Sequence, residues 1–315
     1  MKVIEHIEKR NNPIFSYEII PPKRGGNLSD LISVVEDLKK FDPPYIDITS
    51  HAAEAIYEET DSGIKRQVKR KRPGTLGLCV LIKHKYGIDA VPHILCRGFT
   101  REETEDILIE FHYSGIENVL ALRGDDVSYK KPPRIDRTIN DYAGDLVDQI
   151  SSMNQGKYLS NLLDAEKTNF CIGVAGYPEK HYESPNIKTD IDYLKKKVLS
   201  GADYIVTQMF YDNNDYFNFV DLCRSEGILV PIIPGIKILS SKNQLSTLPK
   251  VFNIDIPYEL SEEVRLAKAK HVKDIGVDWA ARQVEELLNR DVPAIHFYVM
   301  QTSKHVSKLM NKLNI

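Results

Sequence analysis

One carboxylate interrupts an otherwise apolar segment near the start of the chain. Glu18 stands in the segment Ile14–Ile20, which reads IFSYEII and which Pro21 and Pro22 end as a predicted β-strand, because proline has no ladder donor. Burial of an unpaired ionised carboxylate is costly, so it raises the pKa of the group. Glu18 therefore suits a proton donor that works near neutral pH. The alternative is a salt-bridged carboxylate of the core.

Other segments carry side chains that could meet a ligand. The tripeptide Arg123-Gly124-Asp125 follows the apolar segment Asn118–Leu122. Its glycine permits close backbone approach and its arginine can bind phosphate, although an ordinary turn explains the same residues. His93 lies inside a predicted strand and is either a ligand contact or a satisfied core histidine. The run Lys195–Lys197 either reaches a phosphate or forms a solvated helix face.

Composition and missing motifs exclude several classes of protein. The net charge of −3 leaves no basic surface for nucleic acid. The sequence contains no G-x-G-x-x-G, P-loop, G-x-S-x-G or H-E-x-x-H motif, and its four cysteines lack zinc spacing, so we expect free thiols and no metal. No run reaches the roughly 18 apolar residues of a membrane span, and the first residues lack the apolar core of a secretory signal. We therefore expect a cytoplasmic protein.

Apolar segments alternate with amphipathic ones along the whole chain. The predicted strands are Ile14–Ile20, Tyr45–Thr49, Val91–Leu95, Asn118–Leu122, Phe170–Ala175, Tyr204–Gln208, Leu229–Ile233 and Ala294–Tyr298. The predicted helices are Leu28–Phe41, Thr75–Tyr86, Thr100–Ser114, Tyr142–Met153, Ile191–Leu199, Asp215–Ser225 and Thr302–Leu313, with three more between Leu245 and Arg290. Within them, Thr100 and Glu103 form a capping box, and Gly87 is a helix stop.

This order of elements predicts an α/β fold. Parallel neighbours need a crossover, and eight strand–helix units favour a closed (β/α)8 TIM barrel with extra helices before the last strand. We expect a single domain that spans residues 1–315. The alternative is an open, doubly wound sheet. In a barrel the site lies where the strands end, which gathers Glu18, Thr49, His93, Arg123–Asp125, Tyr177–His181, Gln208, Phe210, Pro234-Gly235 and His296–Tyr298.

At these residues the chain resembles the methylenetetrahydrofolate reductases, nearly from end to end. The matching segments, in order, are Phe15–Pro22, Val91–Cys96, Val119–Asp125, Tyr142–Val147, Val174–His181, Thr207–Asp212, Ile232–Ile236 and His296–Tyr298. Each is modest alone, but together they are specific. The length resembles that of the short bacterial form, which has only the catalytic barrel.

The resemblance implies an activity, its cofactors and the role of each residue. The family reduces 5,10-methylenetetrahydrofolate to 5-methyltetrahydrofolate with FAD and with NADH or NADPH in ping-pong fashion, and so feeds methionine synthesis. It implies that Glu18 is the general acid and that Asp125 stabilises the cationic intermediate of the folate. Substrate-binding residues would be Gln208, Phe210 and Thr49. FAD-binding residues would be Thr49, His93, Leu122, Arg123, Gly124, Asp125, Tyr142, Ala143, Tyr177, Glu179, His181, Asp190 and Lys197. A homo-oligomer is expected.

Some segments depart from the family pattern. Lys242 stands where an aromatic residue is common, Gln301-Thr302 replaces an arginine after the last strand, and Lys23 also replaces an arginine. The segment Ser50–Arg66 matches poorly. These differences concern the nicotinamide and the folate tail rather than the flavin. Two alternatives stay open, a flavin barrel related to proline dehydrogenase and a flavin or folate binder without activity.

Overall fold

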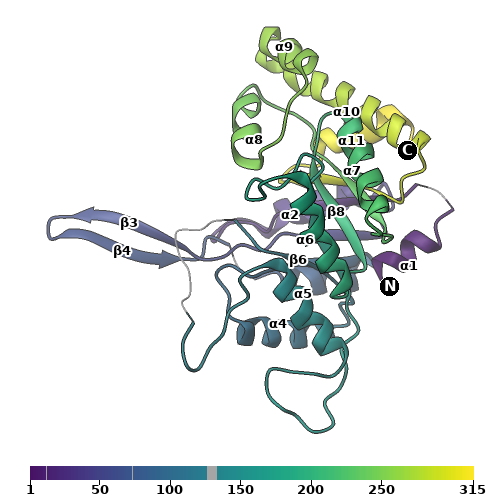
Figure 1. Cartoon of the computed structure of the whole chain (residues 1–315). Helices are drawn as coiled ribbons and strands as arrows, with labels where there is room; N and C mark the ends of the chain where they lie inside the picture. The colour runs from purple at the N-terminus through teal and green to yellow at the C-terminus, as the bar shows by residue number, and fades with distance from the viewer. Residues whose placement is uncertain (12, 73, 126–132) are drawn as a thin grey trace.

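A computed structural model describes residues 1–11, 13–72, 74–125 and 133–315, and it contains a closed barrel of eight parallel strands (Figure 1). Around the barrel the strands follow the order β1 (Phe15–Ile19), β10 (Ile295–Met300), β9 (Ile232–Ile236), β8 (Tyr204–Met209), β7 (Cys171–Gly176), β6 (Asn118–Leu122), β5 (Asp89–Leu95) and β2 (Tyr45–Ile48). Every neighbouring pair is parallel. The fold is a TIM barrel, as the sequence predicts.

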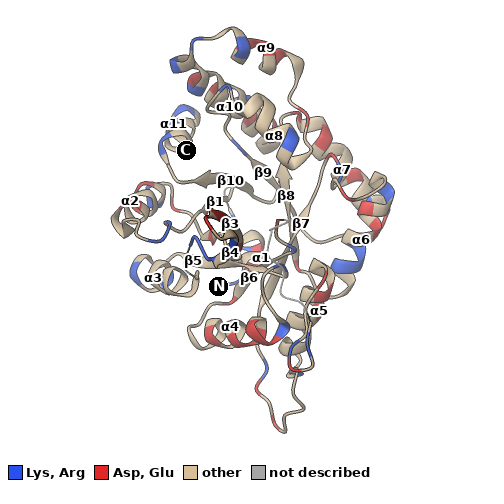
Figure 2. Ribbon diagram, turned by 90° about the vertical axis from the view of Figure 1, so that its left-hand side faces the viewer, with Lys and Arg blue, Asp and Glu red and all other residues tan. Residues whose placement is uncertain are grey.

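Helices surround the strands, and many Lys, Arg, Asp and Glu residues lie on these helices (Figure 2). They are α2 (Leu28–Lys39), α3 (Leu76–Tyr86), α4 (Arg101–Tyr113), α5 (Ala143–Asn154), α6 (Ile187–Leu199), α7 (Asn213–Ser225) and α11 (Lys304–Leu313). Two local predictions are confirmed. Thr100 Oγ1 accepts from Glu103 N at 3.1 Å while the Glu103 carboxylate accepts from Thr100 N at 2.9 Å, and Gly87 ends α3 with a φ of 69°.

The three extra helices lie between β9 and β10, as predicted. They are α8 (Gln244–Phe252), α9 (Tyr258–Leu266) and α10 (Val272–Asn289), and a short 3-10 helix, η1 (Ala269–His271), leads into α10. Trp279 Nε1 donates to the carbonyl oxygen of Tyr211 at 2.9 Å, which ties α10 to the end of β8. At Gly276 a Cβ atom would stand only 1.8 Å from the carbonyl oxygen of Leu239, so glycine permits this close packing.

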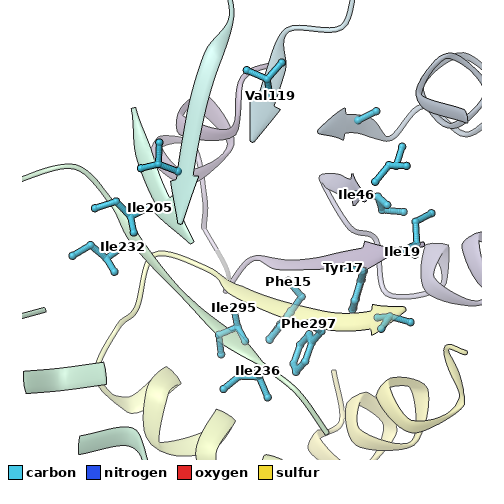
Figure 3. Close-up of a cluster of buried hydrophobic side chains, with 14 of the residues drawn as sticks. Phe15, Tyr17, Ile19, Ile46, Val119, Ile205, Ile232, Ile236, Ile295 and Phe297 are labelled. Carbon is cyan, nitrogen blue, oxygen red and sulfur yellow. The ribbon is translucent and has the colours of Figure 1, made fainter. Parts of the chain in front are cut away.

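Alternate residues of each strand face the helices and the barrel interior. On β1, Phe15, Tyr17 and Ile19 belong to the large outer core, where Phe297 of β10 stacks against the first two rings at 6.1 and 5.9 Å (Figure 3). The intervening residues, Ser16 and Glu18, therefore face inward. This alternation decides which polar side chains enter the barrel.

The amino-terminal end of the barrel is covered by α1 (Val3–Glu8), a helix that the sequence analysis did not predict. Val3 packs in a second buried cluster with inward residues of six strands and with Ile14 and Ala294, which directly precede β1 and β10. Its backbone nitrogen donates to Asn118 Oδ1 at 2.8 Å, at the start of β6. The cluster fills this end with side chains and leaves the opposite end for a ligand.

The structure corrects the sequence predictions in three places. The seventh barrel strand, expected at Leu229–Ile233, is β9 at Ile232–Ile236, so Pro234-Gly235 lies within the strand rather than after it. Helix α6 begins at Ile187, four residues before the predicted start at Ile191.

The third correction is a hairpin in the segment that matches the family poorly. Strands β3 (Glu54–Thr60) and β4 (Gly63–Lys69) pair antiparallel and project from the barrel on the side opposite α1 (Figure 1). Both faces of the hairpin are largely exposed. Its side chains therefore lack the alternation of apolar and polar residues by which a half-buried strand is predicted.

Candidate active site

Four ionisable side chains lie together inside the barrel. Glu18 comes from β1, Asp47 from β2, His93 from β5 and His296 from β10, and each is an inward residue of its strand. All four are buried; Asp47 is 1% exposed and Glu18 is 8% exposed. Strands β10, β1, β2 and β5 are consecutive around the barrel, so strand order brings these residues together from opposite ends of the chain.

His93 lies near both carboxylates, and His296 lies near Asp47. His93 Nε2 lies 3.6 Å from Glu18 Oε2 and 3.7 Å from Asp47 Oδ1, while His296 Nδ1 lies 3.8 Å from Asp47 Oδ2. His296 Nδ1 also forms a 2.9 Å hydrogen bond with Ser16 Oγ. Among the described residues, neither oxygen of Asp47 has a hydrogen-bond partner, nor does His93 Nε2. These groups are close enough to exchange protons after a small movement.

Burial dominates the electrostatics of this group. It raises the pKa of Glu18 to about 6, with the nearby His93 and Lys237 opposing the shift and Asp47 adding to it. Burial likewise raises the pKa of Asp47 to about 6, against the influence of His296. The pKa values of both histidines are lowered by burial, although the neighbouring carboxylates oppose this. Glu18 therefore holds a proton up to a higher pH than an ordinary glutamate does.

A cavity lies where β9, β10 and β1 end, with Ile20 as its lining residue from the end of β1. Its volume is about 210 Å³, and its lining includes Lys237, Tyr298, Met300 and His305. Lys237 Nζ donates to the carbonyl oxygen of Tyr298 at 2.8 Å, and burial lowers the pKa of this lysine while Glu18 opposes the shift. The cavity places a cation beside the proposed acid.

The residues assigned to the flavin lie on the adjoining arc of the rim. They follow or end four consecutive strands, β2, β5, β6 and β7, or lie on α5 and α6. In order they are Thr49, His93, Leu122, Arg123, Gly124, Asp125, Tyr142, Ala143, Tyr177, Glu179, His181, Asp190 and Lys197. Glu18 on β1 and Gln208 on β8 stand at the two ends of this arc. The fold thus brings the predicted residues to one edge of the barrel.

Several contacts hold this arc in place. The guanidinium of Arg123 pairs with Glu183 and lies 4.9 Å from the centre of the Tyr142 ring, which is 61% exposed. Tyr177 and His181 meet edge to face at 4.6 Å. Asp190 accepts from His181 N at 2.9 Å and from Ser184 Oγ at 2.9 Å, so it orders the loop after β7.

Lys197 and Glu179 belong to the same arc but face different partners. Lys197 Nζ donates to the carbonyl oxygen of Ala175 at 2.8 Å, and burial lowers the pKa of Lys197 to about 8 against the influence of Asp190. Burial raises the pKa of Glu179 to about 7, and its carboxylate accepts from Asp255 N. Glu179 thus contacts the loop between α8 and α9.

Asp125 and Glu18 occupy the same end of the barrel. Glu18 is the last residue but one of β1, and Asp125 lies three residues past the end of β6, whose direction is the same. Asp125 is exposed and acts electrostatically on both His51 and Tyr177. A shared ligand at this end could therefore meet both carboxylates.

Two predicted substrate contacts have different surroundings. Gln208 is half-buried at the end of β8, where its Oε1 accepts from Met209 N at 2.9 Å. Phe210 is 0% exposed and stacks on Tyr216 of α7 at 5.5 Å in the outer core. The structure does not place Phe210 at the site, because the β-bulge between Val206 and Met209 changes the side-chain alternation of β8.

Sequence analysis missed Asp47 as a site residue. The signal was the same as that of Glu18, since Asp47 interrupts the apolar strand Tyr45–Ile48. No cluster of His, Cys, Asp or Glu that could hold a metal ion occurs in the part of the chain that the structure describes. Within the same ranges, no helix has the length and apolar character to cross a membrane.

A family model described as methylenetetrahydrofolate reductase matches residues 2–314. The chain belongs to this family. It is 30% identical to the 5,10-methylenetetrahydrofolate reductase of Salmonella typhimurium over 302 residues, covering 95% of this chain and 90% of that protein. It is also 30% identical to the 5,10-methylenetetrahydrofolate reductase of Buchnera aphidicola, covering 92% of this chain and 87% of that protein.

Longer relatives and a solved structure complete the comparison. Methylenetetrahydrofolate reductase 1 of Schizosaccharomyces pombe is 29% identical and matches 98% of this chain, but the chain spans only 47% of that protein. A solved protein from Clostridium thermocellum, described as binding two copies of 5-methyl-5,6,7,8-tetrahydrofolic acid, superposes with a TM-score of 0.62 at 14% identity. That match covers 99% of this chain and 98% of the other, and it supports the barrel fold.

Proposed function

We propose that this protein reduces 5,10-methylenetetrahydrofolate to 5-methyltetrahydrofolate, with FAD as cofactor and NADH or NADPH as the electron source. The observation that carries the proposal is Glu18. This buried acid lies at the rim where barrels bind ligands, and its pKa is raised to about 6. Membership of the reductase family supports the same substrate. A relative in Arabidopsis thaliana has NADH in its name, which makes NADH the first electron donor to test.

The residues on the β2–β7 arc fit a flavin dinucleotide. Thr49 Oγ1 and Arg123 Nε are buried polar atoms without a hydrogen-bond partner among the described residues. Unpaired buried polar atoms are costly, and a ligand rich in carbonyl, hydroxyl and phosphate oxygens would satisfy them. The positive end of helix α5, which begins at Ala143 beside Arg123, suits a phosphate group. Bound FAD would supply the carrier for a hydride between nicotinamide and folate.

The protein's own residues would manage the charge on the folate. Opening of the five-membered ring breaks a carbon–nitrogen bond, and the departing nitrogen keeps the electron pair and needs a proton. Glu18 supplies that proton, because burial raises its pKa to about 6 and so leaves far more of it protonated near neutral pH than of an ordinary glutamate. The remaining cation is stabilised by the carboxylate of Asp125 on the same rim. Gln208, at the far end of the arc, offers both a donor and an acceptor to the pterin.

The proposal is tested with the purified protein loaded with FAD. We expect NADH or NADPH to bleach the flavin anaerobically, and methylenetetrahydrofolate to restore its colour with formation of methyltetrahydrofolate. Steady-state rates should show the ping-pong pattern of two substrates that use one site in turn. A protein that binds no FAD, or whose reduced flavin ignores the folate, would contradict the proposal.

A further inference from the structure

Asp47 is a buried carboxylate that the proposed function leaves without a role. It is 1% exposed, and neither carboxylate oxygen has a hydrogen-bond partner within the described ranges. Two imidazoles flank it, His93 at 3.7 Å and His296 at 3.8 Å. A buried carboxylate with neither a hydrogen bond nor an ion pair at contact distance destabilises a fold unless it is protonated, so its retention calls for a functional explanation.

The position of His93 connects this carboxylate to the proposed acid. The same ring atom, Nε2, lies 3.7 Å from Asp47 and 3.6 Å from Glu18. A movement of less than about 1 Å would bring either carboxyl group to hydrogen-bond length. Asp47 pairs in register with Glu18 on β1 and with Val91 on β5, two residues before His93. Asp47 is 1% exposed and Glu18 is 8% exposed, so Asp47 is the more enclosed of the two carboxyl groups.

We propose that Asp47 is a positioning residue for folate reduction: Asp47 stores a proton beside Glu18 and passes it to Glu18 through His93 Nε2. This inference rests on the proposed function. Each turnover of the folate consumes one proton at Glu18. A second proton held inside the barrel would refill Glu18 while the bound folate still separates it from solvent.

The transfer balances without any further reactant. Glu18 gives its proton to the departing nitrogen and becomes a carboxylate. The Asp47 O–H bond then breaks as His93 Nε2 takes the proton, and the resulting imidazolium gives it to Glu18. His93 returns to its neutral form, with hydrogen on Nδ1, and Asp47 is left ionised. Water restores the proton to Asp47 between turnovers, when the rim is open.

Charged and titratable groups on every adjoining element act on this pair. Glu18 is faced by Asp47 of β2, His93 of β5, Lys237 after β9 and Tyr298 of β10. Asp47 is faced by His93, by His296 of β10, by Tyr45 of its own strand, by Tyr204 of β8 and by Cys79 of α3. Lys237 and an imidazolium favour ionised Glu18, whereas ionised Asp47 opposes it. Removal of the Asp47 charge should therefore let Glu18 ionise at lower pH.

The test is the pH profile of folate reduction in Asp47→Asn. The FAD-loaded enzyme is reduced anaerobically and mixed with methylenetetrahydrofolate between about pH 5 and pH 9, which spans the ordinary range of these groups. We expect the falling limb of the rate to move to lower pH by roughly one pH unit, so that the rate near pH 8 drops about tenfold. Reduction of the flavin by the nicotinamide should keep its wild-type rate, because that step needs no proton from Glu18.

Asp203→Asn is the matched control. Asp203 lies just before β8 at the other end of the barrel, and burial also raises the pKa of its carboxyl, which accepts from Ile172 N at 2.7 Å. This variant should keep the wild-type profile. A folded Asp47→Asn enzyme with a wild-type profile would overturn the inference. Wild-type enzyme without folate turnover would instead overturn the proposed function, so the two failures are distinguishable.

An infrared measurement tests the inference without any substitution in the barrel. In wild-type protein with ¹³C-labelled aspartate carboxyl groups, we expect a protonated aspartate band above about pH 5, where ordinary aspartates are ionised. That band should weaken during a single turnover with methylenetetrahydrofolate. The absence of this band, or a band that turnover leaves unchanged, would contradict the inference that Asp47 stores a proton.

Discussion

At the amino-terminal end of the barrel, two amines and a histidine surround Asp89, whereas at the carboxyl end Glu18 and Asp47 face histidines beyond hydrogen-bond distance. Asp89 receives Lys83 Nζ at 3.0 Å, the terminal amine at 3.0 Å and His6 Nε2 at 2.9 Å. Burial alone would raise its pKa, but these hydrogen bonds together lower it well below its ordinary range. The ionised form is thus favoured for Asp89 at the amino-terminal end, whereas burial favours the protonated form of Asp47 at the carboxyl end.

The difference separates charges that stabilise the fold from charges kept for chemistry. A carboxylate with three hydrogen-bonding partners, two of them amines, contributes stability, because its ionised form is favoured in the folded state. A buried carboxylate without partners is destabilised when ionised, and it persists where a proton must be given up. Substitutions at the two ends should therefore affect different properties, and each prediction below tests that separation.

The largest effect is expected for Glu18→Gln at the carboxyl end. Glutamine keeps the size of the side chain but cannot donate an acidic proton, so folate reduction should fall by about a hundredfold or more. Binding of FAD and its reduction by the nicotinamide should persist. Rapid-mixing measurements of the two half-reactions separate these outcomes. Normal folate turnover in this variant would remove Glu18 from the mechanism.

Asp89→Asn at the amino-terminal end should affect stability and not activity. Loss of the carboxylate leaves two amines and a histidine without their partner, so the free energy of unfolding should fall by about 2 kcal/mol near pH 7. Because the folded pKa lies below the unfolded value, this contribution exists above about pH 4 and is lost as the pH falls through the folded pKa. Urea titrations at several pH values measure it. Glu117→Gln is the control, since exposed Glu117 shares the same amine and should cost under about 0.5 kcal/mol.

Asp47→Asn should raise the free energy of unfolding, whereas Asp89→Asn should lower it. The folded pKa of Asp47 is raised to about 6, so the stability of its protonated form is present at low pH and lost as the pH rises to that value. The variant avoids this loss. Its free energy of unfolding should exceed that of the wild type by about 1–2 kcal/mol above pH 6, and the gain should shrink toward pH 4. Denaturation at pH 8 and at pH 4 measures this difference in the free energy of unfolding. A variant less stable than the wild type at pH 8 would contradict our account of Asp47.

The smallest effect is expected for Tyr204→Phe in the amino-terminal cluster. The Tyr204 hydroxyl is buried without a hydrogen-bond partner among the described residues, and its ring fills the space beside Gly173. Removal of an unsatisfied hydroxyl should change stability by less than about 0.5 kcal/mol. Activity at every pH should match the wild type. A clear change in the pH profile would show that the two ends of the barrel are coupled.

The sequence alone determined the order of strands and helices, because strand alternation, helix periodicity and caps such as Thr100 and Gly87 are local properties of the chain. It also determined that Glu18 is unusual, since a carboxylate within an apolar strand needs no tertiary contact to be noticed. The exposed hairpin β3–β4 escaped prediction because neither of its faces is predominantly buried, which leaves no pattern to detect.

Only the tertiary structure decided which residues share the site. Asp47, His93 and His296 come from distant parts of the sequence, and closure of the barrel between β1 and β10 makes them neighbours. The bulge in β8 directs Phe210 into the outer core, which strand periodicity could not foresee. Contacts between strands depend on register and closure, and these are properties of the whole barrel rather than of any one segment.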